Sequence, residues 1–115
     1  EAPLEAVRRL PPRLKVLTLG PEGALAFLGE GEVRVPGVRV RVVDTVGAGD
    51  TFTAGLLALL LRRGGGRGVL EGLDLEGLRE ALEAAVALSA LACTVRGAGL
   101  PEEGLAAWRA RWLAG

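Results

Sequence analysis

The sequence predicts an α/β domain of the doubly wound type, and three observations support this. Short apolar segments that are typical of strands precede longer apolar segments that are typical of helices. Glycine-containing turns separate these segments, and one of them joins a predicted strand directly to a predicted helix. At the N-terminal end a predicted helix leads into a strand, as in half of a strand–helix–strand unit of a parallel sheet. The 115 residues are enough for one domain with a modest core.

The first part of the chain predicts a helix end followed by two strands. Residues 1–10 carry apolar side chains at helical spacing and lead into two prolines, which are expected to end the helix. Residues 16–19 are expected to form a short buried strand. A Gly-Pro-Glu-Gly turn follows, and residues 24–28 are expected to form the next strand.

Two further strands and a buried helix are expected in the middle of the chain. Val33 and Val35 belong to the first strand, which Pro36 and Gly37 interrupt. In residues 38–42 valine alternates with arginine, the period-two pattern of a half-buried strand. Residues 52–61 are almost continuously apolar and predict a buried helix, which the glycine-rich residues 62–68 end.

Two more helices complete the expected fold. Asp74 can cap a helix over residues 75–92 that is polar on one side and apolar on the other. Pro101 and the two glutamates after it make a favourable first turn for a last helix. The expected solvent face of the first helix carries Glu76, Arg79, Glu80 and Glu83, its inner face carries Leu78, Leu82 and Ala85, and the inner face of the last helix carries Leu105, Trp108 and Trp112.

The segment with functional chemistry is the turn D-T-V-G-A-G-D-T-F at residues 44–52. The start of a helix exposes unpaired N–H groups and a positive dipole end, and glycines let several amides face one anion. A carboxylate at Asp50 would repel a phosphate bound there, unless a substrate hydroxyl lies between them. We therefore expect phosphoryl transfer, with Asp50 accepting the hydroxyl proton and the amides of residues 46–50 facing the phosphoryl oxygens. The alternative is structural, because Asp is also a preferred helix cap.

This turn, followed by A-G-L-L, resembles the C-terminal signature of the ribokinase-like (PfkB) carbohydrate kinase family, whose common form is D-T-x-G-A-G-D-x-F-x-x-G. The resemblance implies transfer of the γ-phosphate of ATP to a sugar hydroxyl, with Asp50 as catalytic base and Gly47, Ala48 and Gly49 as the anion hole. It implies ATP and Mg²⁺ as cofactors. It also implies a K⁺ ion beside the loop, held partly by the backbone carbonyls of Asp44 and Val46.

Two other segments resemble the nucleotide site of the same family. T-L-G-P-E-G at residues 18–23 is similar to the family's T-x-G-x-x-G segment, which implies that Thr18, Gly20 and Gly23 line the nucleotide. Residues 84–98 resemble the helix and loop that close over adenine, with Val86 at a position where the family often has Asn or His. Val86 offers only packing there. Arg96 directly precedes Gly97, whereas the similar R-x-G-A ending of the family has one residue between the arginine and the glycine. The alternative for both segments is a purely structural role. The first would then be a turn between two strands, and the second a buried Ala/Leu helix.

The resemblance covers nearly all of this chain but only the C-terminal part of the family pattern. The expected fold is therefore the C-terminal part of a ribokinase-like doubly wound (Rossmann-like) αβα sandwich, without the N-terminal half and the lid. The sequence begins at Glu1 and contains no methionine, so a fragment is expected. Exposed apolar surface on such a fragment would favour self-association or pairing with a missing N-terminal part.

Composition excludes several other classes of protein. The 14 basic and 14 acidic residues balance, so no nucleic-acid partner is expected. No apolar run reaches the roughly 18 residues of a membrane span, and a cytoplasmic protein is expected. Cys93 is the only cysteine and histidine is absent, which excludes an internal disulfide and a zinc-type cluster. Apolar neighbours predict that the Cys93 thiol is buried.

Three hypotheses remain open at this point. The first is a sugar kinase, of which this chain carries the ATP-binding and catalytic-base part and is expected to be inactive alone. The second is a noncatalytic module that binds a nucleotide or a phosphate. The third is a structural remnant that folds as an oligomer and binds nothing specific. In the first case, the substrate that accepts the phosphate from ATP would be a small sugar. The pattern does not determine which sugar this is.

Overall fold

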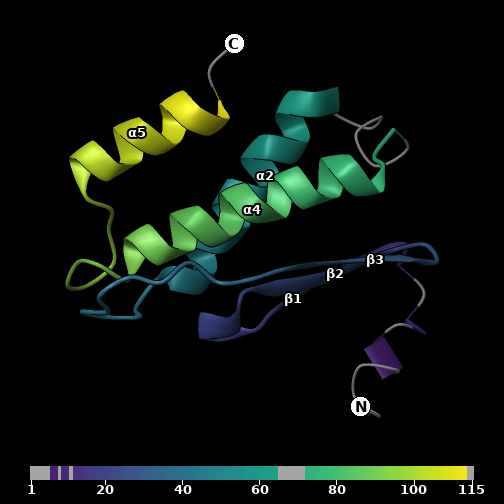
Figure 1. The fold of residues 1–115 in the computed structure, drawn as a ribbon, viewed down its shortest axis with the longest axis horizontal. Helices are drawn as coiled ribbons and strands as arrows, with labels where there is room; N and C mark the ends of the chain where they lie inside the picture. The colour runs from purple at the N-terminus through teal and green to yellow at the C-terminus, as the bar shows by residue number, and fades with distance from the viewer. Residues whose placement is uncertain (1–5, 8, 11, 65–71, 114–115) are drawn as a thin grey trace.

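The computed structural model describes residues 6–7, 9–10, 12–64 and 72–113. A three-stranded sheet lies on one side, two crossing helices cover it, and a third helix lies on their outer side (Figure 1). This is an α/β arrangement. The described elements are β1 (Leu14–Thr18), the 3₁₀ helix η1 (Gly20–Glu22), β2 (Ala24–Leu28), β3 (Gly31–Val35), α2 (Ala48–Gly64), α4 (Leu75–Ala92) and α5 (Glu102–Trp112).

The sheet is an antiparallel meander in the order β1-β2-β3. Its register places Val16 opposite Ala26 and Ala26 opposite Val33. All five residues of β2 are buried, whereas in β3 the valines are buried and Glu32 and Arg34 are exposed. The strand expected at residues 24–28 is confirmed, and the one expected at 16–19 lies at Leu14–Thr18.

All strand pairs in the described sheet are antiparallel, and the parallel partner expected for the first strand is not among the described strands. β2 and β3 are joined by Gly29 and Glu30 alone, and two residues can link only antiparallel neighbours, since a parallel pair needs a long crossover. The helix expected over residues 1–10 falls mostly outside the described residues. Ala6 and Val7 are its described helical residues.

The strand expected at residues 38–42 is also wrong, because β3 ends at Val35 and residues 36–42 pair with no described strand. Pro36 has no N–H to continue the ladder. Val38 and Val42 are 50% and 60% exposed, so the alternation does not mark one side that packs into the core. The valines instead line a cavity, described below.

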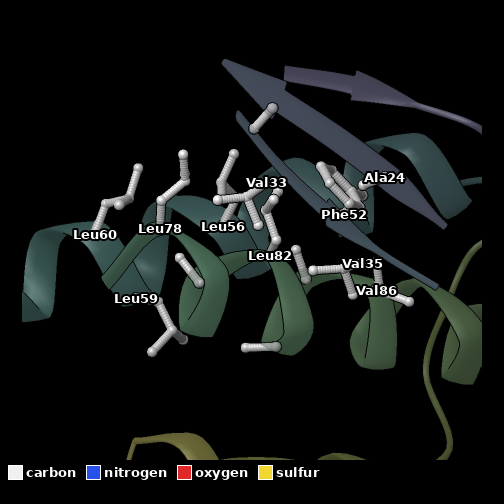
Figure 2. Packing of buried hydrophobic residues seen from close by; sticks show 14 of the residues in the cluster. Ala24, Val33, Val35, Phe52, Leu56, Leu59, Leu60, Leu78, Leu82 and Val86 are labelled. Carbon is white, nitrogen blue, oxygen red and sulfur yellow. The ribbon is translucent and has the colours of Figure 1, made fainter. Parts of the chain in front are cut away.

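Helix α4 is the centre of the core and packs against α2, α5, β2 and β3. Figure 2 shows the side chains of α2 and α4 that meet the valines of β3 in one apolar cluster. The predicted bounds of α4 are confirmed, and Asp74 accepts a hydrogen bond from the Gly77 N–H at 2.8 Å, as a cap does. The indole N–H of Trp108 donates to the Ala84 carbonyl at 2.8 Å and docks α5 on α4.

Helix α2 is longer than the sequence predicts. It begins at Ala48, four residues before the expected start, and runs to Gly64, so residues 62–64 continue the helix instead of starting the expected glycine loop. The rest of that loop, residues 65–68, lies outside the described part. Among the described helices, none combines the length and apolar character that a membrane span needs.

Candidate nucleotide and phosphate site

The signature turn enters α2 through Gly47, whose φ of +83° lies in the left-handed region that favours glycine. The Gly47 carbonyl accepts both the N–H and the hydroxyl of Thr51, at 2.9 and 2.8 Å. These two bonds close the first helical turn around the glycines. The backbone therefore bends sharply and starts a helix within two residues.

The N–H groups of this turn fall into two sets, those with a hydrogen-bond partner and those without one among the described residues. The Val46 N–H donates to the Asp44 carboxylate at 3.1 Å, and the Ala48 N–H donates to the Thr45 carbonyl at 3.2 Å. The N–H groups of Gly47, Gly49 and Asp50 have no hydrogen-bond partner among the described residues. We call these three groups the free amides. The expectation that the amides of Val46 and Ala48 also face the anion is not met in this structure, because the Asp44 carboxylate and the Thr45 carbonyl already accept them.

Asp50 is the third residue of α2 and is exposed. The alternative reading of Asp50 as the helix cap is therefore wrong, since the helix begins two residues earlier. Its carboxylate belongs to the first turn of the helix, on the residue that also contributes one of the free amides. A negative charge near a helix start is favourable, so its position is also compatible with helix stability.

Asp44 ties the turn to the loop that follows α4. One carboxylate oxygen accepts the Gly97 N–H at 2.9 Å and the other accepts the Val46 N–H at 3.1 Å. These hydrogen bonds, first that of Gly97 and then that of Val46, hold the pKa of the Asp44 carboxyl below its ordinary value. The carboxylate is thus a structural link between segments 53 residues apart.

The end of α4 contacts the same turn at two more points. The Cys93 carbonyl accepts the N–H groups of Val43 and Asp44, at 2.7 and 3.2 Å. The Ser89 hydroxyl donates to the Ala48 carbonyl at 3.1 Å. Cys93 itself is only half-buried and is one of the residues that line the cavity, which corrects the expectation of a buried thiol.

The η1 turn and the residues after β3 are in close backbone contact. A Cβ at Gly23, whose φ is +105°, would overlap the Val35 carbonyl oxygen and lie 2.7 Å from the Gly37 nitrogen. A Cβ at Gly37 would in turn overlap the Pro21 carbonyl. Gly23 therefore has a packing role that is independent of any ligand.

A cavity of about 570 Å³ lies where these segments meet. Its walls come from η1, residues 37–42, the start of α2 and the last turns of α4. Most of the residues around it are apolar or glycine. Six of the residues that the sequence predicted to bind a nucleotide or an anion line this cavity: Thr18, Gly20, Gly23, Ala48, Gly49 and Val86.

The other expected site residues flank the cavity without lining it. Asp44, Val46, Gly47 and Asp50 lie next along the chain to the lining residues Thr45, Ala48 and Gly49. Arg96 is exposed and outside the lining.

Sequence reasoning missed Arg39 and Ser89, which both line the cavity. Arg39 was expected on the outer side of a strand, and no sequence signal distinguishes it from its neighbours. Ser89 carries the one hydroxyl within an otherwise apolar stretch of the helix. This contrast was the signal from which the sequence could have indicated a role for it.

Side-chain and backbone oxygens of the turn are both candidate ligands for a metal ion. Within the part of the chain that the structure describes, no group of three His, Cys, Asp or Glu side chains could hold a metal. The carbonyls of Asp44 and Val46 have no hydrogen-bond donor among the same residues. They are therefore available as oxygen ligands.

The comparisons with known proteins agree on one family. Residues 3–104 match the family described as pfkB family carbohydrate kinase. The chain is 58% identical over 48 residues to a fructokinase of Rhizobium leguminosarum bv. trifolii, covering 42% of the chain and 15% of that protein. It is 43% identical over 83 residues to an aminoimidazole riboside kinase of Salmonella typhimurium, covering 72% of the chain and 24% of that protein.

Solved structures show the same similarity. A double mutant of the fructokinase from Vibrio cholerae O395, with fructose, ADP and a potassium ion bound, aligns with a TM-score of 0.72 at 30% identity. The alignment covers 91% of this chain and 33% of that one. The fold described here thus matches part of the ribokinase-type αβα fold. The chain spans at most about a quarter of the two curated relatives named above.

Proposed function

Because the chain belongs to the pfkB family of carbohydrate kinases, we propose that it carries the ATP-binding and catalytic-base part of an enzyme that phosphorylates a sugar hydroxyl. The observation that carries this proposal is the set of free amides at Gly47, Gly49 and Asp50, next to the Asp50 carboxylate. Amide donors that need no rearrangement stabilise the charge of a transferring phosphoryl group. A carboxylate beside them can accept the proton of the attacking hydroxyl.

The cavity is proposed to hold the adenosine part of ATP. Its volume of about 570 Å³ lies within the usual range of small-molecule sites, roughly 300–1,000 Å³. Thr18, Gly20 and Gly23 would line one side, and Val86 would pack against the base from α4. The guanidinium of Arg39, the cation in the lining, would face the phosphates. Ala48 and Gly49 connect this cavity to the free amides.

Two ions are proposed to act with ATP. K⁺ would be held by the backbone carbonyls of Asp44 and Val46, and the related Vibrio cholerae fructokinase has a potassium ion bound. Mg²⁺ would be carried by the ATP phosphates rather than by a cluster of side chains, as is common for this ion. When bound, these cations offset phosphate charge. This chain's residues would then orient the γ-phosphate and keep Asp50 beside the acceptor hydroxyl.

The second candidate function is nucleotide binding without transfer. Asp50 is exposed, and the cavity beside it does not include it in its walls. A sugar would therefore meet an open surface rather than an enclosed pocket in the described residues. We expect the 115-residue chain by itself to bind ATP weakly and to phosphorylate no sugar. The partners proposed for it are a further part of a pfkB-type fold or a second copy of the chain.

Calorimetric titration of the chain with ATP, in buffer containing Mg²⁺ and K⁺, tests the binding proposal. We expect saturable ATP binding, whereas absence of binding up to millimolar ATP would contradict both candidate functions.

In any form of the protein that phosphorylates a sugar, Asp50→Ala is expected to lower kcat by about 10²–10⁴-fold, the usual contribution of a general base. ATP affinity should not fall, because removal of Asp50 also removes a like charge. Unchanged kcat would exclude Asp50 as the base.

A further inference from the structure

Ser89 makes an unusual hydrogen bond for a serine within a helix. A helical Ser often returns its hydroxyl to the carbonyl of the preceding turn of its own helix. Here the hydroxyl crosses to α2 and donates to the Ala48 carbonyl at 3.1 Å. Ala48 is the first residue of α2, and it stands between Gly47 and Gly49, which contribute two of the free amides.

The signature turn is anchored on both sides of Gly47, to α4 and to the residues that directly follow it. Before Gly47, Asp44 is held by the Gly97 N–H and by the Cys93 carbonyl. After Gly47, the anchor from α4 is the hydroxyl of Ser89 on Ala48. Gly47 has a left-handed φ and no side chain that could restrict its backbone. Anchors on both sides of this glycine fix the direction of the amides that lie between and beyond them.

We propose that Ser89 is a positioning residue, which holds the start of α2 so that the amides of Gly47, Gly49 and Asp50 converge on the nucleotide phosphates. The inference rests on the proposed ATP site and adds a residue to it. Ser89 acts through the Ala48 carbonyl and not by touching the phosphates. Because it also lines the cavity, it couples the wall around the base to the phosphate end of the same site.

The test compares ATP with adenosine, which fills the cavity but has no phosphate. Ser89→Ala is expected to weaken ATP binding about fivefold, the effect of losing about one neutral hydrogen bond, and to leave adenosine binding unchanged. Ser89→Thr keeps the hydroxyl and is expected to restore ATP affinity. Cys93→Ala is the matched control, because Cys93 also lines the cavity and the substitution keeps its backbone carbonyl. It is expected to change ATP and adenosine affinity by the same factor.

A readout without nucleotide separates positioning from direct contact. In the free protein, the amide NMR signals of Gly47, Gly49 and Asp50 are expected to move in Ser89→Ala and to keep their positions in Cys93→Ala. The proposal is overturned if ATP binding is unaffected by Ser89→Ala, if adenosine binding falls equally, or if those signals do not move. If the unmutated chain binds adenosine and ATP equally, the phosphate site itself is wrong, and the proposed function fails with it.

Discussion

Gly49 contributes only backbone to the site, because a Cβ at this position would meet no atom within 4 Å. A Cβ can therefore be added at this position without a steric effect. Gly49→Pro deletes the donor in the first helical turn, where proline is tolerated, and Gly49→Ala adds a Cβ but keeps the donor. We expect Gly49→Pro to weaken ATP binding about tenfold or more, as for a hydrogen bond to a charged group, and Gly49→Ala to bind nearly normally. Equal affinities in titration calorimetry would exclude the Gly49 amide as a phosphate ligand.

The lowered pKa of Asp44 predicts that the stability of the fold decreases at acidic pH. Its pKa is lowered in the folded chain, first by the Gly97 N–H and then by that of Val46, so folding favours the charged form. Its stabilising effect is complete above the ordinary Asp pKa of about 3.9 and is lost as the pH falls through the lower folded value. Between about pH 5 and pH 2, Tm should fall less steeply in Asp44→Asn than in the unmutated chain. Glu83→Gln, on the exposed side of α4, is the control and should keep the original slope.

At the scale of elements, the contact between η1 and the end of β3 depends on Gly23. Gly20 and Gly23 both have positive φ, but a Cβ at Gly20 meets nothing within 4 Å, whereas one at Gly23 would overlap the Val35 carbonyl. Gly20→Ala should therefore cost only left-handed strain, about 1–2 kcal/mol. We expect Gly23→Ala to lose more than this in the free energy of unfolding, measured by urea denaturation, because the backbone must also separate. A larger loss at Gly20 would contradict this contact.

The elements that sequence predicted well are those that local signals define. Asp74 is followed by an amphipathic run, and α4 begins and ends where that pattern does. The alternation at residues 38–42 led to the wrong prediction of a strand. It indicates that one side of the segment is apolar, but not whether that side packs against the core or lines a cavity. Here the valines line a cavity, and pairing depends on a partner strand that local sequence cannot specify. The hydrogen bonds of Ser89 and Asp44 across the fold were equally invisible, since each joins segments more than 40 residues apart.

At the scale of the whole molecule, the glycine signature predicted the family. The resemblance also indicated three of the segments around the cavity, but not residues 37–42. It did not predict the antiparallel order of the sheet, which the two-residue connection between β2 and β3 determines. A motif specifies chemistry within one turn, whereas sheet order follows from connection lengths. The free amides were expected as a group, but the structure was needed to show that Asp44 binds the amide of Val46.

The 115-residue chain has two features that favour association of copies. Strand β1 has β2 on one side and no strand on its other side in the described part of the sheet. On α2, Leu57 and Leu61 lie one turn apart and are 50% and 54% exposed. Open strand edges and neighbouring exposed apolar side chains promote pairing with another chain. We therefore expect the average mass of the chain to rise with concentration in sedimentation equilibrium.

Adding charge to α2 tests which surface is responsible. Leu57→Lys with Leu61→Lys should shift association to at least several-fold higher concentration and leave Tm nearly unchanged, because both side chains are half-exposed in the single chain. The control adds the same charge at Ala107 and Ala110, which are exposed on α5, and should associate like the unmutated chain. If both double variants associate equally, α2 is not the contact and the free edge of β1 carries the association. A chain that stays monomeric at every concentration would contradict both surfaces.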